Sequence, residues 1–116
     1  MLVVDDEADL RNLIRLLLEF DDDLEVVSAV GNAEQALHAA SVGADDIDLV
    51  VLDNWLGGPQ TGLDIADRLR TSCPRAKVLL FTASDSDACP SKFIDAVVCK
   101  PQLELLPAVA RQLLSA

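Results

Sequence analysis

The sequence predicts an α/β fold in which a doubly wound sheet of five parallel strands, in the order 2-1-3-4-5, forms the middle of three layers. Short apolar runs typical of buried strands alternate along the chain with segments whose apolar residues recur at helical spacing. Strands joined by helical crossovers run parallel, and right-handed crossovers place helices on both faces of the sheet. Of the 116 residues, 51% are hydrophobic and only 3% are aromatic, which suits an aliphatic core between helices and a parallel sheet.

The first half of the chain is expected to form two strands and two helices. Residues 2–5 form the first strand, and the helix after them, ending near Phe20, is predicted from a face made of Leu10, Leu13, Ile14, Leu17 and Leu18. A second strand is expected within residues 24–30. Asn32 is then a favourable N-cap, with Gln35 three residues on, for a helix whose buried face contains Ala33, Ala36, Leu37 and Ala40.

The second half is expected to form three strands and two helices. The central strand covers residues 47–53, and the loop over residues 54–61 contains two consecutive glycines. A third helix, stopped by Pro74, has Ile65, Ala66, Leu69 and Cys73 on one face. The fourth and fifth strands are predicted at residues 78–82 and 96–99, with room between them for only a turn or two of helix. The last helix is predicted from Leu103, Leu106, Ala110, Leu113 and Leu114, with Pro107 in its first turn.

Charge and composition exclude several classes of function. The formal charge of -11 would repel a phosphate backbone, so direct binding of nucleic acid by this domain is not expected. The chain has no secretory signal and no apolar run of the roughly 18 residues that a membrane span requires. A soluble cytoplasmic protein is therefore expected, in which Cys73, Cys89 and Cys99 are reduced thiols.

Polar side chains stand at the ends of four predicted strands. They are Asp5 and Asp6 at the first, Asp53 at the third, Thr82 at the fourth and Lys100 at the fifth. The carboxyl ends of parallel strands meet at one edge of the sheet, and the expected order places the first and third strands side by side. We therefore expect these side chains to share one crevice, where the carboxylates require a cation.

These strand ends resemble the receiver domains of two-component response regulators. The resemblance rests on Val3-Val4-Asp5-Asp6-Glu7, Val51-Leu52-Asp53, Leu80-Phe81-Thr82-Ala83 and Lys100-Pro101, which follow one another in this order along the whole chain. It implies a flavodoxin-like fold and a single receiver domain over residues 1–116, with no output domain in this chain.

The resemblance also implies a metal-assisted phosphoacceptor. Asp53 is then a carboxylate nucleophile that becomes an aspartyl phosphate. Mg²⁺ offsets the repulsion between this carboxylate and the phosphoryl group. Its implied ligands are Asp6 and Asp53 directly, Asp5 through a water molecule, and the backbone carbonyl of Trp55.

The implied function is a signalling switch rather than an enzyme. A sensor histidine kinase or phosphotransfer protein supplies the phosphoryl group, and the domain assists its own phosphorylation and slow autodephosphorylation. Lys100 supplies a charge for the phosphoryl oxygens and Thr82 a hydroxyl whose inward movement carries the switch, while Trp55 and Ser84 flank the path of attacking water. The switch then regulates a partner or an output domain outside this chain, and a homodimer is one form that such a domain adopts.

Three departures from the family pattern bear on signalling. Gly57 stands where a proline is usual and Gly62 is one residue late, so the loop between them is one residue longer. Val97 occupies the usual place of a switching aromatic residue, and the segment over residues 84–95 is short enough that its helix is trimmed or replaced by a loop. We therefore expect intact chemistry whose output avoids the usual face, built on this helix, the fifth strand and the last helix.

Other interpretations remain beside this one. Asp5, Asp6 and Glu7 suit the start of a helix through their charge alone, and Asp53 taken alone suits a solvated strand end. A pseudo-receiver, which binds proteins without phosphorylation, is the nearest alternative function. A flavin carrier would need a phosphate-cradling loop after the first strand, and an aspartate-based phosphatase would need a second Asp where Trp55 stands.

Overall fold

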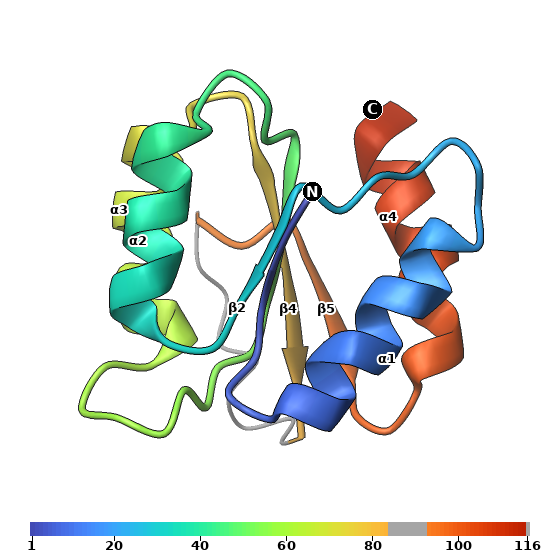
Figure 1. Ribbon diagram of the computed structural model, residues 1–116, viewed down its shortest axis with the longest axis horizontal. Helices are drawn as coiled ribbons and strands as arrows, with labels where there is room; N and C mark the ends of the chain where they lie inside the picture. The colour runs from blue at the N-terminus through green and yellow to red at the C-terminus, as the bar shows by residue number, and fades with distance from the viewer. Residues whose placement is uncertain (84–92, 116) are drawn as a thin grey trace.

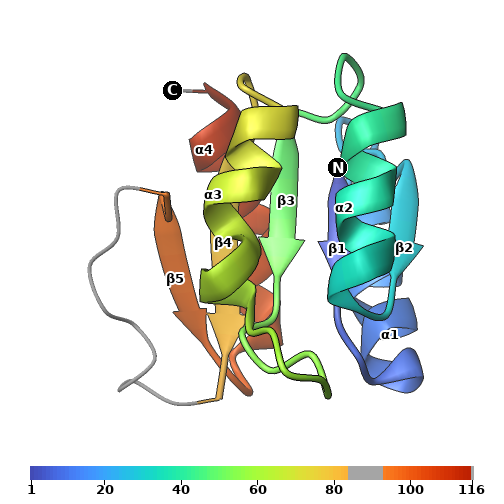
Figure 2. The same cartoon turned by 90° about the vertical axis from the view of Figure 1, so that its left-hand side faces the viewer.

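The computed structural model describes residues 1–83 and 93–115. Its five strands form one parallel sheet in the order β2-β1-β3-β4-β5, as Figure 2 shows from β5 at one edge to β2 at the other. In chain order the strands are β1 (Leu2–Val4), β2 (Ser28–Val30), β3 (Leu49–Leu52), β4 (Lys77–Thr82) and β5 (Ala96–Cys99). The predicted fold class and strand order are confirmed.

Helices cover both faces of this sheet (Figure 1). Helices α1 (Ala8–Glu19) and α4 (Leu106–Ser115) lie on one face, and α2 (Ala33–Val42) and α3 (Gly62–Ser72) lie on the other. A short 3₁₀ helix, η2 (Leu103–Leu105), leads into α4, whose second residue is Pro107, in the first turn as predicted. The shortened helix expected between β4 and β5 falls largely on residues 84–92, which lie outside the described residues. Within the described ranges, no helix combines the length and apolarity needed to span a bilayer.

Strand β3 shows how one sheet serves two cores. Leu49 and Val51 belong to the apolar cluster under α1 and α4, whereas Val50 and Leu52 belong to the cluster under α2 and α3. All four side chains are buried, which explains why the strand is apolar throughout instead of alternating with polar residues. The prediction of a central strand buried on both faces is confirmed.

The start of α2 follows the predicted cap, with one difference. The side chain of Asn32 accepts a hydrogen bond of 2.8 Å from the backbone N–H of Gln35, which satisfies a donor that the helix itself leaves unpaired. The side chain of Gln35, however, accepts from the N–H of Gly31 at 3.1 Å rather than from Asn32. The reciprocal bond of a capping box is therefore made one residue earlier in the chain.

The predicted buried face of α1 is too broad. Ile14 and Leu18 are buried as expected, but Leu13 is 46% exposed. The helix packs on one side against the sheet and α4, so only a narrow stripe of its surface is covered, and Leu13 lies beside that stripe. Leu114, used to predict the last helix, lies within α4 as expected, with its side chain 38% exposed.

Strand β2 is shorter than the predicted residues 24–30. Leu2 of β1 pairs with Ser28, and the N–H of Val27 donates to the carbonyl of Met1 at 2.9 Å. Earlier residues have no strand beside them in the described structure, so they are not assigned to β2. Leu24 and Val26 are nevertheless buried, which explains why their hydrophobicity resembled that of a strand.

Candidate functional site

The residues predicted at the strand ends lie around one cavity at the carboxyl edge of the sheet, the edge toward which the arrowheads point in Figure 2. The cavity has a volume of about 660 Å³ and is lined by Asp6, Glu7, Asp53, Trp55, Thr82, Ala83 and Lys100. Asp5 lies beside it, within salt-bridge distance of Lys100. The structure thus brings together every side chain that the sequence placed at this edge.

Asp53 is held at the end of β3 by contacts on every side. Its backbone N–H donates to the carbonyl of Val4 at 2.9 Å, which ties it to β1. Of its carboxylate oxygens, Oδ1 accepts from the N–H of Trp55 and Oδ2 from Nζ of Lys100, both at 3.1 Å. A Cβ on Gly62 would lie 2.5 Å from the Asp53 carbonyl oxygen, so only glycine lets α3 begin this close to the strand end.

Asp5 contributes one satisfied and one unsatisfied carboxylate oxygen. Oδ1 accepts a hydrogen bond of 2.9 Å from the N–H of Glu7, the N-cap of α1. Oδ2 is buried, accepts no hydrogen bond, and lies 3.5 Å from Nζ of Lys100. The simpler role as the start of a helix accounts for Oδ1 alone, and a buried carboxylate oxygen without a hydrogen bond is costly unless a cation approaches it.

Lys100 sits between the two buried carboxylates. Its backbone N–H donates to the carbonyl of Thr82 at 2.7 Å, and its ammonium lies 5.5 Å from the ring centroid of Phe81. Burial alone would lower the pKa of Lys100, but its hydrogen bond to Asp53 and the charges of Asp53 and Asp5 outweigh this and raise it. The ammonium is therefore a permanent positive charge at the site.

The pKa of Asp53 is raised, chiefly because burial disfavours its charged form. The negative charge of Asp5 acts in the same direction, whereas the Trp55 N–H and Lys100 act against it. The site thus holds more negative charge than one ammonium balances, and a further cation would stabilise it.

Thr82 and Trp55 border the same cavity in different ways. Thr82 ends β4 and is buried. Ala83 beside it also lines the cavity and, with its small side chain, fills little of it. The indole of Trp55 is 70% exposed, although its backbone N–H is fixed on Asp53. Ser84, expected to flank the path of attacking water, lies outside the described residues.

Two residues that support the site, Arg11 and Asn54, were not predicted from the sequence. Arg11 donates from Nη1 to the backbone carbonyl of Asp5 at 2.8 Å. Asn54 accepts with its side chain from the N–H of Leu63 at 3.0 Å, and with its carbonyl from the N–H of Gly62 at 2.8 Å. The sequence offers no signal for these contacts, because they join residues six to nine positions apart across loops.

The acidic residues suit a hard divalent cation. Asp5, Asp6 and Asp53 each offer a carboxylate oxygen within 4.8 Å of the others, and Mg²⁺ prefers oxygen ligands and few carboxylates. Oδ2 of Asp5 is buried, accepts no hydrogen bond and lies 3.5 Å from the Lys100 ammonium, so a metal ion facing the cluster would stabilise it further. Among the described residues, this is the one cluster of three or more potential metal-binding side chains.

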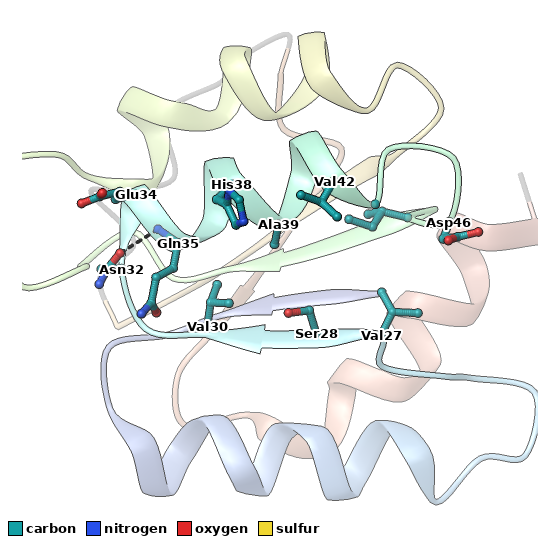
Figure 3. A pocket seen from close by; sticks show the side chains of 12 residues that line it. Val27, Ser28, Val30, Asn32, Glu34, Gln35, His38, Ala39, Val42 and Asp46 are labelled. Atoms are coloured by element: carbon teal, nitrogen blue, oxygen red, sulfur yellow. Dashed lines mark hydrogen bonds between the residues drawn. The ribbon is translucent and has the colours of Figure 1, made fainter.

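A larger hollow, of about 980 Å³, lies between β2 and α2 (Figure 3). Glu34 and Asp46 stand at its opposite ends, with the exposed His38 between them. Its charged groups therefore do not converge on one point, and its lining includes Val27, Val30 and Val42. We place the functional site at the acidic cavity, where buried charges meet.

Comparison with known proteins identifies relatives of this chain. The sequence model of the response regulator receiver domain matches residues 1–100. The nitrate/nitrite response regulator protein NarP of Escherichia coli is 34% identical over 96 residues, covering 83% of this chain and 43% of NarP. A protein-glutamate methylesterase/protein-glutamine glutaminase of Paramagnetospirillum magneticum is 42% identical over 80 residues, covering 69% of this chain and 20% of that protein. The chain thus spans less than half the length of these relatives.

Solved structures show the same likeness. The receiver domain of NtrX from Brucella abortus superposes with a TM-score of 0.81 at 29% identity, covering 99% of this chain and 98% of that one. The beryllofluoride-activated receiver domain of DrrB gives a TM-score of 0.78 at 26% identity, covering 99% and 96%. With the family match over residues 1–100, these likenesses show that the chain belongs to the response regulator receiver domain family.

Proposed function

We propose that this receiver domain accepts a phosphoryl group on Asp53 in the presence of Mg²⁺ and changes conformation as a result. The observation that carries the proposal is the placement of the Asp53 carboxylate. It is buried, with the Lys100 ammonium 3.1 Å away and a second carboxylate, that of Asp5, nearby. A solvated strand end would need neither the burial nor the paired cation. A nucleophile for phosphoryl transfer needs both, because charge must be balanced where the phosphoryl group arrives.

The proposed step is the attack of an Asp53 carboxylate oxygen on the phosphorus of a phosphohistidine. The new oxygen–phosphorus bond gives an aspartyl phosphate, and the nitrogen–phosphorus bond of the donor breaks. The donor imidazole leaves with that electron pair and takes up a proton. Because the attacking and transferred groups are both negative, the reaction depends on cations that face the phosphoryl oxygens.

The chain supplies these charges from named residues. Asp6 and Asp53 are the proposed direct ligands of Mg²⁺, with Asp5 acting through a coordinated water and Trp55 through its backbone carbonyl. When bound, the ion neutralises carboxylate and phosphoryl charge. Lys100, already 3.1 Å from Asp53 Oδ2, is the proposed partner of a phosphoryl oxygen once the Asp53 carboxylate has become an acyl phosphate.

Thr82 is the proposed reporter of phosphorylation. It ends β4 at the same cavity, and its carbonyl is bonded to the N–H of Lys100. A hydroxyl drawn toward a phosphoryl oxygen would move the chain that follows Thr82. The partner that supplies the phosphoryl group is proposed to be a histidine kinase or phosphotransfer protein, as the receiver family implies.

A phosphorylation-independent pseudo-receiver is the alternative. The observation that favours it is Val97, a 38% exposed aliphatic residue in β5, where receivers commonly carry a switching aromatic residue. The pseudo-receiver alternative predicts a site that binds neither a metal ion nor a phosphoryl group.

Labelling with acetyl phosphate separates the two functions. The protein is incubated with this donor, with Mg²⁺ or with EDTA, and its intact mass is measured. We expect one phosphoryl adduct that requires Mg²⁺ and is absent from Asp53→Asn. Asp48→Asn, a change in a carboxylate at the opposite end of β3, is the matched control and should label normally. Failure of the unmodified protein to form the adduct would favour the pseudo-receiver.

A further inference from the structure

The loop after β3 lies directly against one of the proposed metal ligands. Gly57 has a φ of 72°, a left-handed conformation that residues with a side chain rarely adopt. A Cβ at this position would lie 3.1 Å from Oδ2 of Asp6 and within 4 Å of its Cβ and Cγ. The Asp6 carboxylate therefore lies next to the space that a side chain at position 57 would fill.

The Asp6 carboxylate is the least fixed of the three carboxylates in the cluster. No hydrogen bond or ion pair to its side chain is present in the described part of the chain, in contrast to Asp5 and Asp53, which are each fixed by hydrogen bonds. Asp6 is also exposed, so it has room to rotate away from the other two carboxylates. The position where a Cβ of residue 57 would stand lies next to this carboxylate, so a side chain there would push Asp6 out of its place.

The loop cannot easily withdraw from Asp6, because its first residues are anchored. The N–H of Trp55 is bonded to Asp53 Oδ1, and Leu56 is 5% exposed within the core under α2 and α3. Gly57 follows directly. Gly58, by contrast, would meet no atom within 4 Å if it carried a Cβ, so two neighbouring glycines have different surroundings.

We propose that Gly57 is a positioning residue for the metal site, which holds the Asp6 carboxylate in the orientation that completes the cluster with Asp5 and Asp53. This inference rests on the proposed function, because it assigns Asp6 to Mg²⁺. A side chain at position 57 displaces Asp6 and weakens metal binding while Asp53 keeps its own contacts.

The test is a Mg²⁺ titration of the purified protein, followed by the fluorescence of Trp55, the only tryptophan of the chain, which lines the cavity. Residues that support a metal ligand typically change affinity by about 10–100-fold when they are replaced. We expect Gly57→Ala to weaken Mg²⁺ binding by about tenfold or more on this basis. Gly58→Ala, the matched control, should bind Mg²⁺ within about twofold of the unmodified protein, because its new methyl group meets nothing.

Backbone strain is separated from the contact on Asp6 by a second variant. Gly57→Asn adds a Cβ at the same place, but asparagine tolerates the left-handed conformation better than alanine. It should also weaken binding, and it replaces Gly57→Ala if that variant fails to fold. Urea unfolding in EDTA reports the strain independently of the metal.

The outcomes are distinct. Normal Mg²⁺ affinity in either Gly57 variant, or an equal loss in Gly58→Ala, overturns the role of Gly57 while leaving the proposed function intact. Absence of Mg²⁺ binding in the unmodified protein overturns the proposed function, and this inference with it. Weaker binding confined to the Gly57 variants supports both.

Discussion

Replacing Lys100 by methionine removes the cation that separates two buried carboxylates. In the folded protein its ammonium lies 3.1 Å from Asp53 Oδ2 and 3.5 Å from Asp5 Oδ2. At an effective dielectric constant of about 20, each contact corresponds to an attraction of about 5 kcal/mol. The cost of removing the ammonium from water cancels much of this, and loss of one partner from a buried pair typically costs about 3–5 kcal/mol.

We expect Lys100→Met to lower the free energy of unfolding of the metal-free protein by about 2–3 kcal/mol, somewhat less than that range for a fully buried pair. The reason is that the Lys100 side chain is 21% exposed, so water screens part of the attraction. The measurement is urea unfolding in EDTA. The slope of the unfolding free energy against urea concentration should be the same in both proteins. Lys77→Met is the matched control, because Lys77 makes no ion pair in the described structure, and it should change stability by less than about 0.5 kcal/mol.

A second substitution tests the reason for the loss. In the double variant Lys100→Met with Asp53→Asn, one of the two carboxylates left without a cation is gone, so most of the lost stability should return. Mg²⁺ should also stabilise Lys100→Met more than the unmodified protein, since the ammonium no longer competes for the carboxylates. Additive losses in the double variant, or an unchanged stability of Lys100→Met, would refute this electrostatic account.

Three further predictions follow from individual contacts. Burial raises the folded-state pKa of Asp53 above that of an exposed aspartate, so its ionisation weakens the fold as pH rises through that pKa. Thermal melts in EDTA should show Asp53→Asn more stable than the unmodified protein at neutral pH, with the gain lost below the pKa of the unfolded state. Asn32→Ala removes the α2 cap and should cost about 1 kcal/mol in urea unfolding. Amide exchange with beryllofluoride should change mainly away from β5 and α4, and protection confined to them would refute the proposed output route.

Much of the fold could be predicted because the informative patterns are local. The apolar run of β3 ends at a carboxylate within a few residues, and β5 was predicted over the residues it occupies, Ala96–Cys99. The cap at Asn32 likewise depends on a spacing of three residues. The exposure of individual side chains was harder to predict than the elements themselves. Neighbours distant in sequence decide how much of the surface of α1 is buried, and Leu13 lies outside the buried part.

The residues of the site likewise fall into those that could be predicted from the sequence and those that could not. Its charged residues could be named because each ends a strand, and the order of the strands brings those ends together. Their supports could not, because Arg11 reaches the carbonyl of Asp5 and Asn54 reaches Leu63 through turns that only the folded chain defines. The closeness of Gly57 to Asp6 depends on the path of the loop after β3, which only the folded chain defines.

The identity of the phosphorylated residue tests the central claim most directly. After incubation with acetyl phosphate and Mg²⁺, the protein is treated with borohydride, which reduces an aspartyl phosphate to homoserine with release of phosphate, and its peptides are sequenced by mass spectrometry. We expect homoserine in place of Asp53 and nowhere else. Homoserine in place of Asp5 or Asp6, or unreduced aspartate at all three positions, would contradict the assignment of Asp53 as the phosphoacceptor.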